Sequence, residues 1–182
     1  LVMTKIKTTP YWWEAAPPSS GPVIKISDVC DVVIVGAGYA GLSAAITLSR
    51  AGRSVQVFDR QLPGEGASTR NGGLASGNIK MSFRQMTEKF GLKHAKAVYL
   101  EGKMARQKLS DFIHAESLDC DFKLTGRFIG AFKPEHFEAQ AREADFINKH
   151  LGVGAYMITK EDQHNEIETD MYFGGMLRPD LG

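Results

Sequence analysis

The hydrophobic and polar positions of residues 30–58 predict a strand, a turn, a helix and a second strand. Residues 30–35 include the β-branched run Val32-Val33-Ile34-Val35, which is typical of a fully buried strand in a parallel sheet. The segment from Tyr39 to Ala51 favours a helix that ends at Gly52. A second strand is expected over residues 54–58, which completes a βαβ unit of about 30 residues.

The pattern then becomes helical, with a few short strands. We expect helices from about Ser82 to about Leu118, broken at Gly91, and from Pro134 to about His150. Strands are expected over residues 122–132, with Gly126 as a turn or bulge, and over residues 155–158 and 171–177. Because a doubly wound sheet usually has several more parallel strands than the two predicted here, we expect part of the domain to be missing.

The first 28 residues predict an extended arm. Tyr11, Trp12 and Trp13 are followed by the turn-rich stretch Pro17-Pro18-Ser19-Ser20-Gly21-Pro22. Three adjacent exposed rings would make an unusually apolar tail. The aromatic residues are therefore expected to dock on the folded body.

Composition narrows the function classes. The chain has 182 residues, 43% hydrophobic and 24% charged, with a net charge of +1, so we expect no nucleic-acid partner. Two cysteines without CxxC spacing favour a reducing compartment, with the cytoplasm as the default. The histidines have no metal-ligand spacing, so no metal is expected. The uncharged run between Asp31 and Arg50 contains three glycines and reads as strand, turn and helix, so no membrane span is expected.

The candidate chemistry begins with the motif Gly36-x-Gly38-x-x-Gly41. It follows a predicted strand, opens a helix and lies 18 residues (59 minus 41) before Asp59, which is the arrangement of a dinucleotide site. The first glycine permits a tight turn, Gly38 lets the backbone approach a pyrophosphate, and Gly41 lets the helix pack on the sheet. The helix N-terminus favours a diphosphate, and Asp59 is expected to accept hydrogen bonds from a ribose. This motif alone does not separate FAD from NAD.

The loop after the second strand separates these two cofactors. Residues 66–73 read Gly-Ala-Ser-Thr-Arg-Asn-Gly-Gly. Such a loop presents backbone N–H groups to a flat ring or a diphosphate without obstruction by side chains. An NAD domain has no need of it, so the loop favours FAD. A flexible surface loop is the alternative that composition leaves open.

These residues resemble a known family. The stretch from Val33 to Gly66 is similar to the FAD fingerprint of glutathione-reductase-type flavoproteins, with Ala45, Leu48, Gly52, Val55 and Val57 at the matching apolar or small positions. The loop at 66–73 resembles the GAS-x-RNGG loop of the D-amino-acid oxidase superfamily, especially its gamma-glutamylputrescine-oxidase-like branch, which also begins with an aromatic, proline-containing arm. Family members commonly carry Glu where this chain has Asp59.

The resemblance implies an α/β fold: an incomplete FAD-binding Rossmann-like domain of the glutathione-reductase type, with the first part of an α+β substrate domain. We expect residues 1–28 to form the arm, 29–118 part of the FAD domain and 119–182 part of the substrate domain. FAD is the expected cofactor. Its expected binding residues are Gly36, Gly38, Tyr39, Ala40, Gly41, Asp59, Arg60, Ser68, Thr69, Arg70, Asn71, Gly72 and Gly73.

The resemblance also implies the reaction. The expected substrate is a small amine or amino acid, oxidised by hydride transfer from the carbon next to nitrogen to flavin N5, which leaves an imine that hydrolyses. Arg70 is a candidate to stabilise the reduced flavin, against a structural salt bridge or a pyrophosphate contact. Two alternatives stay open, namely an NAD-linked dehydrogenase and a truncated, non-catalytic fragment. We expect the 182 residues alone to be inactive without the C-terminal remainder of the protein or a companion fragment.

Overall fold

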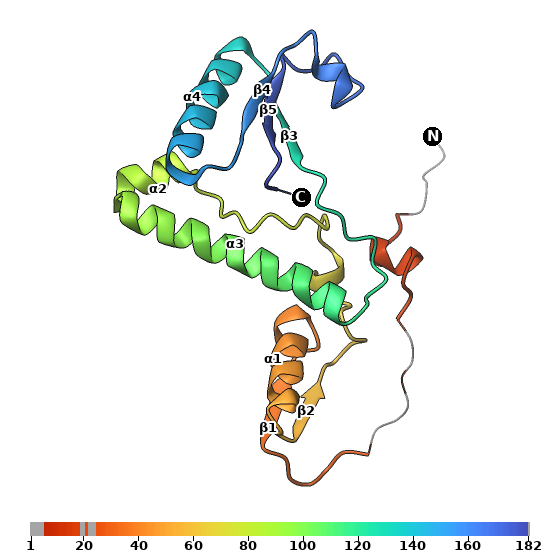
Figure 1. Ribbon diagram of the computed structural model, residues 1–182. Helices are drawn as coiled ribbons and strands as arrows, with labels where there is room; N and C mark the ends of the chain where they lie inside the picture. The colour runs from red at the N-terminus through yellow and green to blue at the C-terminus, as the bar shows by residue number, and fades with distance from the viewer. Residues whose placement is uncertain (1–5, 19–20, 22–24, 182) are drawn as a thin grey trace. The chain divides into compact units, whose positions relative to one another are not determined.

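The computed structural model describes residues 6–18, 21 and 25–181 (Figure 1). Ser19, Ser20 and Pro22 of the expected linker, and Gly182, lie outside the described residues. The chain divides into two compact units, Leu1–Gly73 and Leu74–Gly182. The elements in chain order are η1 (Tyr11–Glu14), β1 (Val32–Val35), α1 (Tyr39–Arg50), β2 (Val55–Phe58), η2 (Ala67–Thr69), α2 (Phe83–Phe90), α3 (Leu92–Ala115), β3 (Arg127–Gly130), α4 (Pro134–Leu151), β4 (Tyr156–Ile158), η3 (Gln163–Asn165) and β5 (Gly175–Arg178).

The boundary between the compact units differs from the expected domain boundary at residues 118 and 119. A compact unit is a property of the contacts within this chain, whereas the expected domains refer to the complete family fold. The expected division at residues 118 and 119 therefore stays a prediction.

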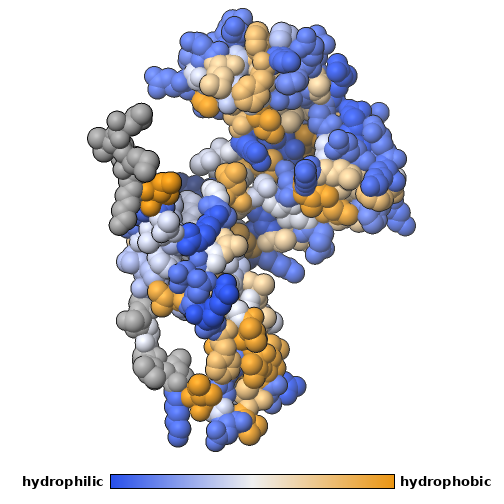
Figure 2. All heavy atoms as spheres, turned by 180° about the vertical axis from the view of Figure 1, so that it is seen from behind, coloured by the Kyte–Doolittle hydropathy of each residue, from blue (hydrophilic) through white to orange (hydrophobic). Residues whose placement is uncertain are grey.

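The first unit contains the βαβ unit that the sequence predicts. Strands β1 and β2 pair in parallel, with Val32 opposite Val55 and Val35 opposite Phe58, and α1 packs on this two-stranded sheet. The expectation that β1 is fully buried is wrong. Ile34 faces α1, but Val33 and Val35 on the other face are 59% and 88% exposed. Figure 2 shows hydrophobic residues at the surface of the part of the molecule that holds β1, α1 and β2.

The sequence predicted an extended arm, but part of the arm is helical. Residues Tyr11–Glu14 form the 3-10 helix η1, in which the N–H of Trp13 donates to the carbonyl of Pro10 at 3.2 Å. Pro10 fixes its own φ and is buried, so it anchors this turn. Trp12 docks on the folded part of the unit by donating its indole N–H to the carbonyl of Asn71. Tyr11 is 70% exposed, so the expected docking holds for Trp12 and not for Tyr11.

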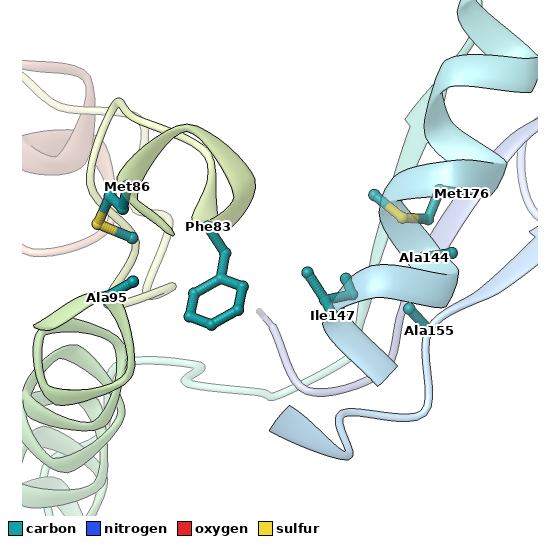
Figure 3. Close-up of a cluster of buried hydrophobic side chains, with 7 residues drawn as sticks. All are labelled: Phe83, Met86, Ala95, Ala144, Ile147, Ala155 and Met176. Atoms are coloured by element: carbon teal, nitrogen blue, oxygen red, sulfur yellow. The ribbon is translucent and has the colours of Figure 1, made fainter. Parts of the chain in front are cut away.

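The second unit has the apolar core. Helix α2 begins at Phe83 with a capping box formed by Ser82 and Gln85, and Gly91 separates α2 from α3 as predicted. The three-stranded antiparallel sheet has the order β3-β5-β4. Buried side chains of α2, α3, α4, β5 and the segment before β4 pack together (Figure 3). This cluster consists of Phe83, Met86, Ala95, Ala144, Ile147, Ala155 and Met176.

Two predicted strands are shorter than expected. Only Arg127–Gly130 of residues 122–132 is a strand, because its partner β5 ends at Arg178 and Pro179 has no N–H to continue the ladder. Of residues 171–177, only those from Gly175 onward are in β5. Gly174 has a φ of +78°, outside the strand region, so the regular ladder begins only after it.

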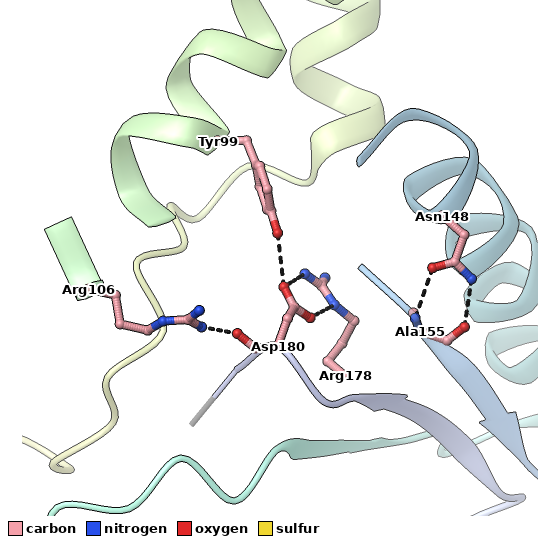
Figure 4. Close-up of polar contacts among 6 residues, drawn as sticks. All are labelled: Tyr99, Arg106, Asn148, Ala155, Arg178 and Asp180. Carbon is pink, nitrogen blue, oxygen red and sulfur yellow. Dashed lines mark hydrogen bonds and ion pairs between the residues drawn. The ribbon is translucent and has the colours of Figure 1, made fainter. Parts of the chain in front are cut away.

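A polar cluster holds the end of β5 (Figure 4). Asp180 accepts two hydrogen bonds from Arg178, at 2.7 and 2.8 Å, and one from the hydroxyl of Tyr99 at 2.9 Å. Burial and the hydrogen bond to Asp180 raise the pKa of Tyr99 to about 12. Arg106 of α3 donates to the carbonyl of Asp180. These bonds connect the last described residues of the chain to α3.

Segment 74–80 crosses α3 at a contact between two glycines. A Cβ added to Gly77 would overlap the backbone carbonyl of Gly102, and a Cβ added to Gly102 would overlap the carbonyl of Gly77. Each glycine therefore makes room for the other's backbone.

Candidate functional site

The glycine turn between β1 and α1 has the geometry that the sequence predicted. Gly36 has a φ of +110°, which residues with a side chain rarely adopt. A Cβ on Gly41 would overlap the carbonyl oxygen of Gly36 and lie 3.2 Å from Cγ2 of Ile34. The first glycine thus forms the turn and the third lets α1 pack on β1. Helix α1 begins at Tyr39, so the positive end of its dipole lies at this turn.

Asp59 follows strand β2 and contacts the same turn. Its Oδ2 accepts the N–H of Ala37 at 2.7 Å, and its Oδ1 accepts the N–H of Gln61 at 2.9 Å. These backbone hydrogen bonds, that from Ala37 first, hold the pKa of Asp59 below its ordinary value. The side chain is therefore an exposed, ionised carboxylate with a fixed position beside the turn.

A hollow of about 340 Å³ lies at the carboxyl ends of the two parallel strands, lined by Val35, Gly36, Phe58, Asp59 and Arg60. Ligands of open α/β sheets bind at this edge. The lining combines apolar side chains with one carboxylate and one guanidinium. This combination suits a nucleoside, with an apolar base and a hydroxylated ribose.

Ser68 connects the second glycine-rich loop to the start of α1. Its hydroxyl oxygen accepts the backbone N–H of Tyr39 at 3.0 Å. A Cβ on Gly38 would lie 2.8 Å from this oxygen, so the middle glycine of the turn allows the approach of Ser68. A helix N-terminus binds a diphosphate through the free N–H groups of its first turn. In this structure the N–H group of Tyr39 already donates to the hydroxyl of Ser68.

The loop at residues 66–73 has a defined fold. The hydroxyl of Thr69 donates to the carbonyl of Gly64 at 2.5 Å. The side chain of Asn71 donates to the carbonyl of Ser68 and accepts the N–H of Gly73, both at 2.8 Å. Gly72 is exposed, and nothing lies within 4 Å of a Cβ added there. These hydrogen bonds define one conformation of a largely exposed loop, and its place along a cofactor stays a prediction.

Arg70 makes contacts that the sequence did not predict. Its Nε donates to the carbonyl of Glu65 at 3.1 Å, and its Nη1 donates to the carbonyl of Thr8 in the arm at 2.8 Å. The side chain is exposed. These contacts are neither the salt bridge nor the pyrophosphate contact that sequence reasoning weighed, and they give Arg70 a role in joining two segments.

The structure brings most of the expected site residues together in the first unit. The glycine turn, Asp59 and Ser68 are connected through the contacts described above, with Arg60 at the hollow and Ala40 in the first turn of α1. Whether each residue contacts a cofactor stays a prediction. Sequence reasoning missed Thr8 as a partner, and it gave the indole N–H of Trp12 no specific acceptor. The only signal was the aromatic run in the arm.

The βαβ unit, the glycine turn and the carboxylate after β2 define a dinucleotide-binding protein. The FAD dependent oxidoreductase family (DAO) matches residues 31–182, and the chain belongs to this family. This match confirms the family resemblance, the expected fold class and FAD as the cofactor of the family. It gives no support to the NAD-linked alternative.

Individual relatives agree with this assignment. The chain is 26% identical to gamma-glutamylputrescine oxidoreductase of Escherichia coli (strain K12), over 83% of this chain and 35% of that protein. The structure is similar to glycine oxidase from Geobacillus kaustophilus, with a TM-score of 0.64 and 22% identity over 84% of this chain and 40% of the other. The structure is also similar to L-amino acid deaminase from Proteus vulgaris, with a TM-score of 0.66 and 20% identity over 90% of this chain and 36% of the other. The chain therefore spans about a third of the length of the first relative.

Two further features are absent from the residues that the structure describes. None of the helices in that part of the chain is long and apolar enough to cross a membrane. Within the same residues, no three His, Cys, Asp or Glu side chains come together as metal ligands do.

Proposed function

We propose that the protein is an FAD-dependent oxidoreductase that oxidises a C–N bond of a small amine or amino acid. The observation that carries this proposal is the arrangement of the first unit, in which the glycine turn, Asp59 and the loop at residues 66–73 contact one another around the N-terminus of α1. Membership of the FAD dependent oxidoreductase family supports the cofactor. The E. coli relative, an oxidoreductase of gamma-glutamylputrescine by name, supports a substrate with a C–N bond.

The residues present fit FAD. The hollow beside Asp59 suits the adenosine, because an ionised carboxylate accepts hydrogen bonds from ribose hydroxyls and repels a 2′-phosphate. The turn from Gly36 to Gly41 and the positive end of α1 suit the diphosphate. Residues Ser68 to Gly73 are proposed to lie along the flavin.

The protein's contribution to the reaction is binding and orientation. FAD held by these residues would supply the two-electron oxidant for the C–N bond, by hydride transfer from the substrate carbon next to nitrogen to flavin N5, and water would hydrolyse the imine that is left. The hollow would hold the adenosine end of the cofactor, the glycine turn its diphosphate and the loop at 66–73 its flavin end, so that the ring would be held in one orientation toward the substrate. A cation next to the ring favours its anionic reduced form. Arg70 is the candidate within the loop, in competition with its contact to Thr8.

We further propose that turnover requires more sequence than these 182 residues. The chain spans about a third of the length of the E. coli relative. The face of β1 that carries Val33 and Val35 is apolar and exposed, and a parallel sheet is usually covered on both faces. The C-terminal remainder of the protein or a companion fragment is proposed to cover this face and to complete the substrate pocket. The two cysteines support a cytoplasmic location as a prediction.

Cofactor analysis of the full-length protein tests the proposed function. The protein is purified with flavin available, and the released cofactor is identified by chromatography and absorbance. We expect FAD and an absorbance band of bound oxidised flavin. Bound NAD, or a colourless protein that does not take up FAD, would refute the proposal.

A pair of glycine variants adds a structural control. Gly41→Ala places a methyl group against the carbonyl of Gly36, so FAD affinity is expected to fall by at least about 100-fold. Gly21→Ala is the same change where nothing lies within 4 Å, and it should leave the affinity unchanged. Equal FAD binding by both variants would contradict the role given to the turn.

A further inference from the structure

The N-terminal arm contacts the loop that is proposed to lie along the flavin. The described arm residues 6–18 contain η1, which contacts η2 of the loop at residues 66–73. Both segments belong to the first unit. The arm reaches across more than fifty residues of sequence to contact this loop through Trp12 and Thr8.

Trp12 makes the first of these contacts. Its indole N–H donates to the backbone carbonyl of Asn71 at 2.9 Å. The ring lies against Gly73, where an added Cβ would be 2.9 Å from Cζ2 of Trp12. Trp12 therefore contacts the loop both by a directed hydrogen bond and by ring packing that needs a glycine opposite.

Arg70 makes the second contact, from the loop back to the arm. Its guanidinium donates to the carbonyl of Thr8 through Nη1 and to the carbonyl of Glu65 through Nε. Between Thr8 and Trp12 lies the buried Pro10, and Lys7 pairs with Glu14 across the same turn. The arm is thus folded on itself where it meets the loop.

The contacts continue from the arm to the start of α1. Trp12 holds the carbonyl of Asn71, and the side chain of Asn71 bonds to the carbonyl of Ser68 and the N–H of Gly73. The hydroxyl of Ser68 in turn accepts the N–H of Tyr39. Displacing the arm would therefore release the loop at its Asn71 end.

We infer that the arm fixes the loop at residues 66–73 in the conformation that binds FAD, with Trp12 and Arg70 as positioning residues. This inference rests on the proposed function. A loop that is ordered before the cofactor arrives binds it more tightly, because the ordering entropy is not lost during binding. In this role Arg70 acts on the cofactor through the arm. The cation role next to the flavin would require the same side chain to act directly.

Variants of Trp12 in the full-length protein test the inference with two measurements. The first is hydrogen exchange of the 66–73 peptide in the protein without FAD, and the second is the Kd for FAD from quenching of flavin fluorescence. Trp12→Ala is expected to increase exchange in the peptide and to weaken FAD binding about tenfold, as expected for the loss of one hydrogen bond and its packing. Trp12→Phe keeps most of the ring and removes the N–H donor, so it should weaken binding about threefold.

Tyr11→Ala is the matched control. It removes a neighbouring side chain that is 70% exposed and whose ring centroid lies 5.2 Å from that of Trp12, edge to face. It does not remove any of the contacts with the loop described above. Its Kd should stay within about twofold of the wild type. If both Trp12 variants bind FAD within twofold of the wild type, the inference is wrong, even if Trp12→Ala alters exchange. A wild-type protein that binds no FAD would refute the proposed function instead.

A double-mutant cycle separates the two roles of Arg70. If Arg70 acts through the arm, Arg70→Gln weakens FAD binding in the wild type but has less than about a twofold effect in Trp12→Ala, because both changes release the same segment. If the two effects on Kd multiply, Arg70 acts independently of the arm, and its assignment as a positioning residue is overturned.

Discussion

Each of the two compact units is stabilised internally by a different kind of contact. In the second unit, apolar side chains from three helices and the sheet form a buried cluster. In the first unit, Pro10 and Ala37 are the buried residues among those that the structure describes. Its segments are joined mostly through backbone groups, as in the bonds of Asp59 to Ala37 and of Ser68 to Tyr39.

This difference relates stability to function. A buried apolar cluster stabilises a fold without any ligand. Exposed hydrogen bonds contribute less, since water competes for the same groups. The first unit should therefore depend on its cofactor and on further covering sequence for much of its order, while the second should depend on its own side chains.

The largest expected effect is in the second unit. Ile147 is 1% exposed, and Ile147→Ala leaves a cavity that should cost about 2–5 kcal/mol in the free energy of opening. Native-state hydrogen exchange of the peptide that covers α4 in the full-length protein measures this cost. Ile6→Ala is the same change at a position in the first unit that is 85% exposed, and it should change the free energy of opening by less than about 0.5 kcal/mol. A cost below about 1 kcal/mol at Ile147 would contradict the contrast between the units.

The next effect is that of FAD on the first unit. A ligand at 100 times its Kd stabilises the state that binds it by about 2.7 kcal/mol. Hydrogen exchange with and without FAD should therefore slow most in residues 36–41 and 66–73. Equal slowing in α4 would indicate that the two units are stabilised together and would remove the distinction.

The smallest effect is the response to acid. The pKa of Asp59 is held below its ordinary value of 3.8 by the N–H of Ala37 and then that of Gln61. Asp59 therefore contributes fully to the stability of the folded state at pH values above its pKa in the unfolded chain. This contribution is lost as the pH falls through the lower pKa of the folded state. The difference in melting temperature between the wild type and Asp59→Asn should shrink below about pH 4. A difference that persists unchanged to pH 2 would contradict this assignment.

Asp180 provides the comparison within the second unit. Burial alone would raise its pKa, but the hydrogen bonds and charge of Arg178, together with Tyr99, outweigh burial and lower it. The sign of the acid response is thus the same as for Asp59, although its cause is a side-chain ion pair and not a backbone turn.

The elements of this fold were predictable where local spacing determines them. The turn at Gly36, the helix from Tyr39 and the break at Gly91 follow from residue types with a direct effect on the backbone. The exposure of Val33 and Val35 was not predictable, because it depends on which elements cover the sheet and not on the strand itself.

The site was predictable in its residues and less so in its contacts. Asp59 lies at the turn as the spacing required. The bond of Ser68 to Tyr39 spans 29 residues and that of Arg70 to Thr8 spans 62. No local pattern encodes such pairs, because they depend on how separate segments fold back on one another.

The crossing of Gly77 and Gly102 limits how this sequence can evolve. At an ordinary core contact, a larger residue on one side can be offset by a smaller one on the other. Here each backbone fills the space that the other residue leaves, so neither position can compensate for a change at its partner. A lineage that loses either glycine has no second substitution at this pair that restores the crossing, and it must move segment 74–80 away from α3 instead.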